Sequence, residues 1–346
     1  MSHECNARRS LRSLVALSVA AGMLTACSSE TSNAAAASDC STLEGRNISL
    51  VVPYTPGGGY DSYARLVAPY LEEQLNATVA VENKPGAGGL LAVNNLLTQK
   101  PDGTTIAIMN GVGGGGASIA GADGAPFSLD DLTYLGRVAG DPPLVVTNGT
   151  GPYRSWEDVR KADSFRWGST GPGAEDYITP SILTAVFDLN AEVVTGFPGS
   201  GETELGVQQG NVDGMSGEPG SRRAAVENGS QTPVLVMGRE TPEWLADDIP
   251  SVTEVEMTES QQKIIDAHLA LVELGRPLVA PPAMDEGLKA CFRDAVAAAM
   301  KDPELIADSE KQERPLGFRS GEELDGFVKQ IMEAPAEYEE LLSTLY

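Results

Sequence analysis

The stretch VVPYTPGGGYDSYAR, residues 51–65, decides which fold is expected for this chain. A short β-branched run ends at a proline and an aromatic residue, three glycines follow, and Asp61 begins an amphipathic pattern. This order predicts a strand, a glycine turn and the start of a helix. Because the first N–H groups of a helix have no partner within it, such a turn is suited to bind a carboxylate or a phosphate.

The same order of strand, turn and helix recurs along the chain. Strands are predicted at Asn47–Pro53, Thr78–Glu82, Thr104–Met109, Leu144–Thr147, Phe165–Trp167, Glu192–Val194 and Val234–Met237. Helices are predicted at Asp61–Leu75, Leu90–Thr98, Ser155–Lys161, Ile178–Phe187 and Leu205–Gln209. Alternating strands and helices favour parallel sheets with crossovers. We therefore expect an α/β protein with two similar lobes and a ligand cleft between them.

Two further glycine turns, Gly168–Gly173 and Phe197–Gly201, follow predicted strands in the second half. On facing lobes they would lie opposite the first turn, across the cleft. A formal G-x-G-x-x-G at Gly111–Gly116 also follows a strand, but the residues after it make a poor helix. A flexible loop at the cleft is therefore expected there, not a dinucleotide site.

Composition argues against most enzyme classes and against nucleic acid. The 346 residues carry a formal charge of −25, whereas nucleic-acid binding needs clustered Lys and Arg. The two histidines are His3 and His268, and the second lies in an apolar helical context typical of a packed residue. Gly-Lys, Cys-x-x-Cys and His-Glu-x-x-His are absent from the sequence. We therefore expect no catalytic residue, no cofactor and no metal; an enzyme with Asp61 as its base is the weaker alternative.

The N-terminus has the pattern of an export signal. Three arginines precede a short apolar run, Leu14–Met23, and then the motif LTAC, Leu24–Cys27, which resembles the lipobox of bacterial lipoproteins. The run is too short for a spanning helix. The resemblance implies a signal peptide at 1–26, a lipidated Cys27 and a tether at 27–44, which places the protein on the outer face of the cell membrane. The alternative is an ordinary secretory signal with a chance cysteine.

Cys40 and Cys291 remain in the mature chain once Cys5 is removed and Cys27 is lipidated. An even pair in an oxidising compartment predicts a disulfide. Against this, Cys291 lies on the apolar face of a strongly periodic helix, where a buried free thiol is the simpler interpretation.

Three ordered motifs resemble a known family. They are PYTPGGGYDSYAR (53–65), VENKPGAGG (81–89) and PDGTTIAIM (101–109), and FSLDDLTYLGRVA, WGSTGPG, GNVD and DDIPSVTE continue the match. Together they resemble the substrate-binding proteins of tripartite tricarboxylate transporters, the Bug-type receptors. The resemblance implies a periplasmic-binding-protein fold (type II) that closes on a small organic carboxylate.

Carried over to this sequence, the resemblance implies a binding site in three parts. The ligand-binding residues expected are Tyr54, Thr55, Gly57, Gly58, Gly59 and Asp61 on the first wall, Ser169, Thr170, Gly171 and Gly173 on the second, and Phe197, Gly199 and Ser200 at the third turn. The third turn departs from the family pattern Pro-Tyr-Lys-Gly, and Tyr177 stands where a histidine is usual. These departures concern the distal part of the ligand, not the carboxylate clamp.

The resemblance also implies the organisation and role of the protein. Residues 45–142 with 276–346 would form lobe 1, and 143–275 would form lobe 2. The protein would be a monomeric receptor, not an enzyme, that delivers its ligand to the large and small membrane subunits of a transporter. A sensor that presents the carboxylate to a signalling receptor is the alternative, and the sequence does not separate the two.

Overall fold

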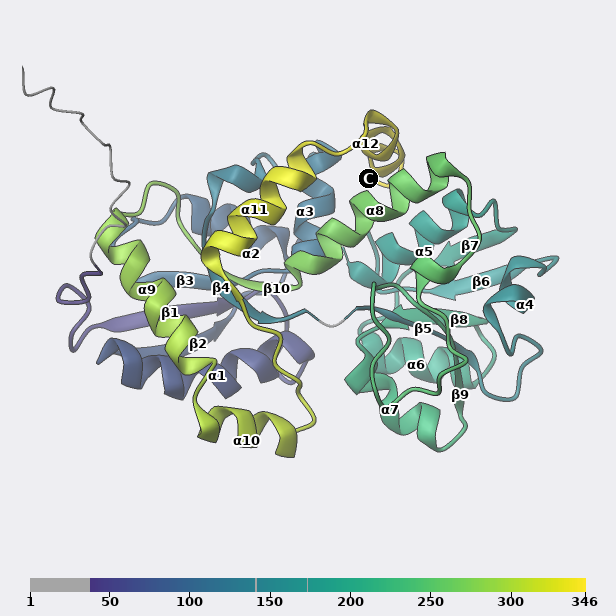
Figure 1. Ribbon diagram of the computed structural model, residues 1–346, viewed down its shortest axis with the longest axis horizontal. Helices are drawn as coiled ribbons and strands as arrows, with labels where there is room; N and C mark the ends of the chain where they lie inside the picture. The colour runs from purple at the N-terminus through teal and green to yellow at the C-terminus, as the bar shows by residue number, and fades with distance from the viewer. Residues whose placement is uncertain (1–37, 141, 173) are drawn as a thin grey trace, which may run out of the picture. The chain divides into compact units, whose positions relative to one another are not determined.

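The computed structural model describes residues 38–140, 142–172 and 174–346, whose strands form two sheets (Figure 1). The predicted signal peptide 1–26 and Cys27 lie outside these residues. The first sheet has the order β11-β4-β10-β3-β1-β2. Its strands are β1 (Asn47–Val52), β2 (Thr78–Asn83), β3 (Thr105–Ile108), β4 (Thr133–Ala139), β10 (Arg276–Ala280) and β11 (Arg319–Ser320).

The second sheet has the order β7-β6-β8-β5-β9. Its strands are β5 (Leu144–Asn148), β6 (Phe165–Gly168), β7 (Ala191–Val194), β8 (Gly214–Gly217) and β9 (Gln231–Val236). The two sheets and the helices between their strands confirm the predicted α/β class.

Both sheets are mixed, which corrects the expectation of parallel sheets. β1 pairs in parallel with β2 and β3, as the strand–helix alternation predicts. β10 instead runs antiparallel to β3 and β4, because the chain enters it from helix α8 after completing the second sheet. β5 likewise runs antiparallel to β8 and β9.

The helices of the described residues are α1 (Gly59–Leu75), α2 (Leu90–Leu97), α3 (Gly111–Ile119), α4 (Trp156–Arg160), α5 (Glu175–Val186), α6 (Ser200–Gln208), α7 (Pro219–Glu227), α8 (Glu259–Leu274), α9 (Glu286–Ala299), α10 (Pro303–Lys311), α11 (Gly321–Met332) and α12 (Ala336–Ser343). The five helices predicted by residue range are present, with ends that differ by up to five residues, whereas α3 and α7 were not predicted. Within the part of the chain described, no helix combines the length and apolarity needed to cross a membrane.

Alternating residues of β1 belong to two hydrophobic clusters. Ile48, Leu50 and Val52 pack with α1 and α9, and Val51 belongs to a second cluster that also contains residues of α5, α8 and α12. That second cluster includes buried side chains from both sheets, such as Tyr134 and Trp167. The two halves of the chain therefore share one continuous apolar core.

The prediction of a flexible loop at Gly111–Gly116 is wrong, because these glycines form helix α3. The side chain of Asn110 accepts a hydrogen bond from the N–H of Gly113 and so caps the helix. A Cβ on Gly115 would lie 2.5 Å from Leu271 of α8, and one on Gly111 would lie 2.7 Å from the carbonyl oxygen of Gly275. Close packing against α8 explains the glycines and outweighs their low helix propensity.

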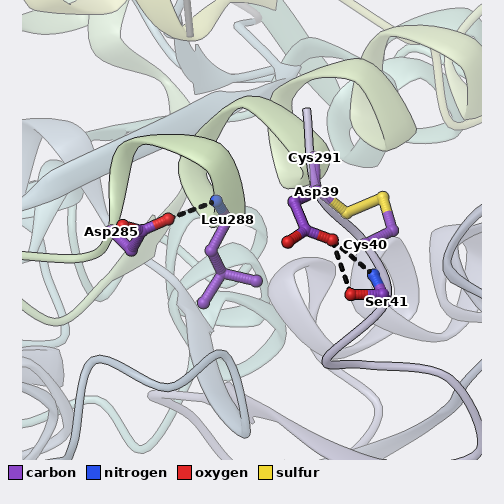
Figure 2. The surroundings of a disulfide bond; sticks show 6 residues. All are labelled: Asp39, Cys40, Ser41, Asp285, Leu288 and Cys291. Atoms are coloured by element: carbon purple, nitrogen blue, oxygen red, sulfur yellow. Dashed lines mark hydrogen bonds between the residues drawn. A yellow bond between two sulfur atoms is a disulfide. The ribbon is translucent and has the colours of Figure 1, made fainter. Parts of the chain in front are cut away.

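The predicted disulfide between Cys40 and Cys291 is present, with a Cα–Cα distance of 5.3 Å (Figure 2). Cys291 lies on the buried face of α9, as its apolar periodicity indicates, and is fully buried. The N–H of Asp39 donates to the carbonyl of Gly287, and Asp285 caps the start of α9 by accepting from Leu288. The bond thus ties the segment before β1 to a helix far along the chain.

His268 is a packed residue of α8, as its apolar surroundings predict. It is fully buried, with Nε2 3.1 Å from the hydroxyl of Thr179 and Nδ1 3.0 Å from the hydroxyl of Tyr338. Burial lowers the pKa of His268 to about 3, so the ring is neutral near pH 7. These two contacts connect α8 with α5 and with α12.

Candidate functional site

The first glycine turn is held by Asp61, in the first turn of α1. The Asp61 carboxylate is buried and accepts a hydrogen bond from the N–H of Gly57 at 2.8 Å. It also accepts from Arg65 at 3.0 Å and from Asn83 at 2.9 Å. Burial opposes the ionisation of Asp61, but these hydrogen bonds outweigh it and lower its pKa. Asp61 is therefore a fixed anion that shapes the turn and is poorly suited to act as a base.

Tyr54 is anchored beside this turn by residues of neighbouring segments. Its hydroxyl donates to the carbonyl of Gly88 at 3.0 Å and accepts from the side chain of Asn110 at 2.7 Å. Asn83 donates to the backbone carbonyl of Tyr54, in addition to Asp61. Asn83 and Gly88 both belong to the motif at 81–89. Hydrogen bonds with this second motif therefore hold Tyr54 of the first motif in place.

The start of α1 is open to an anion. Gly57 has φ +88°, which favours glycine, and Thr55, Gly57 and Gly58 are exposed. Gly58 is the N-cap residue, and no side chain among the described residues caps this helix end. The first N–H groups of α1 and its dipole therefore favour negative charge at this point.

An aspartate holds the second turn in the same way. Asp176, in the first turn of α5, accepts from the N–H and the hydroxyl of Thr170 at 3.0 Å and 2.8 Å and from the hydroxyl of Ser169 at 3.1 Å. Ser169 is fully buried, and its oxygen accepts from the N–H of Gly171, which has φ +140°. Gly173 lies outside the described residues.

The third turn is attached to the second. The N–H of Phe197 donates to the carbonyl of Ser169, and its ring packs against Gly168 and Gly206. Gly199 is the N-cap of α6, and Ser200 is exposed at its first position. Phe197 thus contributes to the core of the second half, while Gly199 and Ser200 lie at a helix start.

Close contacts link the start of α1 to the second half. A Cβ on Gly59 would lie 3.4 Å from Oε2 of Glu218, which follows β8. The rings of Tyr54 and Tyr60 lie 4.8 Å apart between their centroids. The start of α1 therefore lies close to Glu218, at the start of α7 in the second half of the chain.

Glu175, the first residue of α5, is a titratable group within this region. Its carboxylate accepts a hydrogen bond from the hydroxyl of Ser216, and burial raises its pKa to about 7. The hydrogen bond from Ser216 and the charge of Arg276 act in the opposite direction, toward ionisation. Glu175 therefore changes its charge close to physiological pH.

Glu175→Gln will flatten the pH dependence of stability between pH 5 and pH 8. The pKa of Glu175 in the folded protein lies above the usual value of 4.5. Its contribution to the free energy of unfolding is therefore fully present below pH 4.5 and is lost as pH rises through about 7. Between pH 5 and pH 8, the free energy of unfolding of the wild type should fall by on the order of 2 kcal/mol more than that of the variant. Urea unfolding of both proteins at pH 5, 6.5 and 8 measures the difference, and equal pH dependence would contradict the assignment.

Several residues of this region are absent from the sequence-based prediction. Arg65 and Asn83 lie inside the quoted motifs, so the resemblance to the family could have marked them. Glu218 and Arg276 come from distant segments and carry no local signal. In residues 38–140, 142–172 and 174–346, no group of three or more His, Cys, Asp or Glu could hold a metal ion.

Comparison with known proteins identifies the family. The model of the tripartite tricarboxylate transporter family receptor matches residues 63–313, more than half of the chain. Among curated relatives, Protein BugT of Bordetella pertussis is 30% identical over 119 residues, which cover 34% of this chain and 36% of BugT. The chain spans half or less of the length of the first curated relatives that it matches.

Solved structures share the fold at low sequence identity. MatC from Rhodopseudomonas palustris, with bound malate, has a TM-score of 0.69 and 20% identity, over 86% of this chain and 99% of MatC. Another R. palustris protein, with adipate, has a TM-score of 0.67 and 19% identity, over 87% of this chain and 97% of its own. These similarities confirm the periplasmic-binding-protein fold. The family match shows that the chain belongs to the tripartite tricarboxylate transporter family of receptors.

Proposed function

We propose that this protein binds a small organic carboxylate outside the cytoplasm and delivers it to the membrane subunits of a tripartite transporter. The observation that carries the proposal is the pair of turns held by Asp61 and Asp176. At the first, the start of α1 carries no side-chain cap and an anion is favoured. Malate and adipate, bound by the two similar R. palustris proteins, are carboxylates of this kind.

The proposed site joins two lobes, 45–142 with 276–346 and 143–275. The first sheet draws its strands from the former and the second sheet from the latter, which supports the division. We place the carboxylate at Thr55, Gly57, Gly58 and Gly59, walled by Tyr54. The second-half residues Ser169, Thr170, Gly171, Gly173, Gly199 and Ser200 would contact the rest of the ligand.

Calorimetric titration tests the binding function directly. The purified protein is titrated with acetate, succinate, malate, adipate, benzoate and glutamate, and mass spectrometry identifies any ligand that copurifies. Three to five charge-assisted hydrogen bonds, less the cost of association, predict a Kd in the nanomolar to micromolar range for at least one carboxylate. Succinamide, which lacks the charge, is the control and should not bind. Absence of binding by every acid and of any copurified ligand would overturn the proposal.

Cys27→Ser will release the protein from the membrane fraction. The LTAC motif places a lipid on Cys27, and two or more acyl chains are needed for stable anchoring. Fractionation of cells that express the wild type or the variant measures the distribution. Cys5→Ser, which leaves the motif unchanged, is the control and should stay with the membranes, and retention of the Cys27 variant there would contradict the anchor.

A further inference from the structure

An ion-pair network joins the second half of the chain to the first. Glu218 follows β8 and is the N-cap residue of α7, whereas Arg276 is the first residue of β10. Oε2 of Glu218 lies 3.2 Å from Nη1 of Arg314 and 3.7 Å from Nη2 of Arg276. Ser221 donates to the same oxygen at 2.8 Å. The side chains of Glu218 and Arg276 are only 8% and 11% exposed, so little water screens the pair.

This network lies against the start of α1. A Cβ on Gly59, the first residue of α1, would be 3.4 Å from Oε2 of Glu218 and 3.9 Å from Nη2 of Arg276. The guanidinium of Arg276 also lies over the rings of Tyr60 and Tyr63, 5.1 Å and 4.9 Å from their centroids. A cation is therefore fixed beside the helix end at which the proposed carboxylate binds.

Glu218 places its own carboxylate in the same surroundings. A ligand carboxylate at the α1 start would lie near this charge, and two adjacent carboxylates disfavour each other unless a cation separates them. The contacts of the Glu218 carboxylate also differ in length, because Arg314 and Ser221 are closer to it than Arg276 is. Its second oxygen, Oε1, is buried with no hydrogen-bond partner among the described residues. Glu218 can thus leave Arg276 while Arg314 and Ser221 still hold it.

We propose that Arg276 is a ligand-binding residue and that Glu218 is an internal carboxylate that competes with the ligand for it. The proposal rests on the proposed carboxylate-binding function. It adds a charged side chain to a site otherwise built from backbone amides and hydroxyls. It also couples ligand binding to the contact between α7 and the first sheet, because the ligand replaces one member of the network.

Glu218→Gln and Arg276→Gln test the competition by calorimetric titration with the six acids named above. Removing the competing charge should raise the affinity of Glu218→Gln for the bound acid about tenfold, whereas Arg276→Gln should lower it at least tenfold. The double variant should bind no more tightly than Arg276→Gln alone, because the competition acts through the guanidinium. A gain of affinity is an outcome that merely structural damage would not produce.

Glu322→Gln is the matched control, because Glu322 pairs with Arg293 at 2.8 Å on the helices α11 and α9. It should leave the affinity unchanged.

Glu218→Asp, which shortens the side chain by one carbon, replaces Glu218→Gln in the test if the glutamine variant does not fold. It should also bind the acid more tightly than the wild type does. Equal or weaker binding by the Glu218 variants, with the wild type binding an acid, would overturn the competition alone. Absence of binding by the wild type and by every variant would overturn the proposed function as well.

Discussion

Replacing Cys40 and Cys291 together with serine will lower the free energy of unfolding by about 3–5 kcal/mol. The disulfide joins residues separated by 251 positions, so it removes a large loop entropy from the unfolded chain. It also fixes the segment that contains the fully buried Leu43 against α9. Without the bond, that segment is ordered only by its packing and a few backbone hydrogen bonds.

Urea unfolding of the wild type and the double variant, each with and without reductant, measures this loss. The two proteins differ only at Cys40 and Cys291, so the comparison isolates the disulfide. Reductant should bring the wild type to the stability of the variant and leave the variant unchanged. Equal stability of the two oxidised proteins would show that the bond contributes nothing to the fold.

Asp61→Ala will weaken carboxylate binding about 100-fold and lower the free energy of unfolding by about 2–3 kcal/mol. The variant loses the hydrogen bonds from Gly57, Arg65 and Asn83, which together hold the first glycine turn. Hydrogen bonds to a charged group contribute about 1.5–3 kcal/mol each, and binding needs the turn in one conformation.

Asp102→Ala is the matched control for this prediction. Asp102 also holds a glycine turn, by accepting from the N–H and the hydroxyl of Thr104 at 3.0 Å and 2.6 Å. Its turn precedes β3, whereas the Asp61 turn follows β1, and the two strands are parallel neighbours, so the turns lie at opposite ends of the strands. Calorimetry should find unchanged affinity in the control. Wild-type affinity in Asp61→Ala would remove Asp61 from the site.

Local patterns predicted the elements that local chemistry determines. The β-branched run before the first glycine turn became β1, and the amphipathic pattern after it became α1. Asp61 could be placed near the first turn because an acid at the start of a helix reaches nearby N–H groups, whereas Asp176, which holds the second turn, was not predicted. The sequence also located the disulfide, although it did not exclude a buried thiol at Cys291.

Two features escaped prediction because they depend on distant partners. The low helix propensity of the glycines of α3 predicted a loop, whereas in the structure the segment is helical and Gly115 packs closely against Leu271 of α8. The antiparallel position of β10 depends on the path of the chain between the two sheets.

By itself, the sequence determined most of the strand–turn–helix units, the glycine turn within 51–65 and the resemblance to the family, because those properties reside in contiguous residues. The tertiary structure alone decided which charges surround that turn. Glu218 and Arg276 are 58 positions apart in the chain, and their carboxylate and guanidinium lie 3.7 Å apart. No periodicity or motif predicts that distance, because it arises only when the first residues of α7 and β10 lie beside the start of α1 in the folded chain.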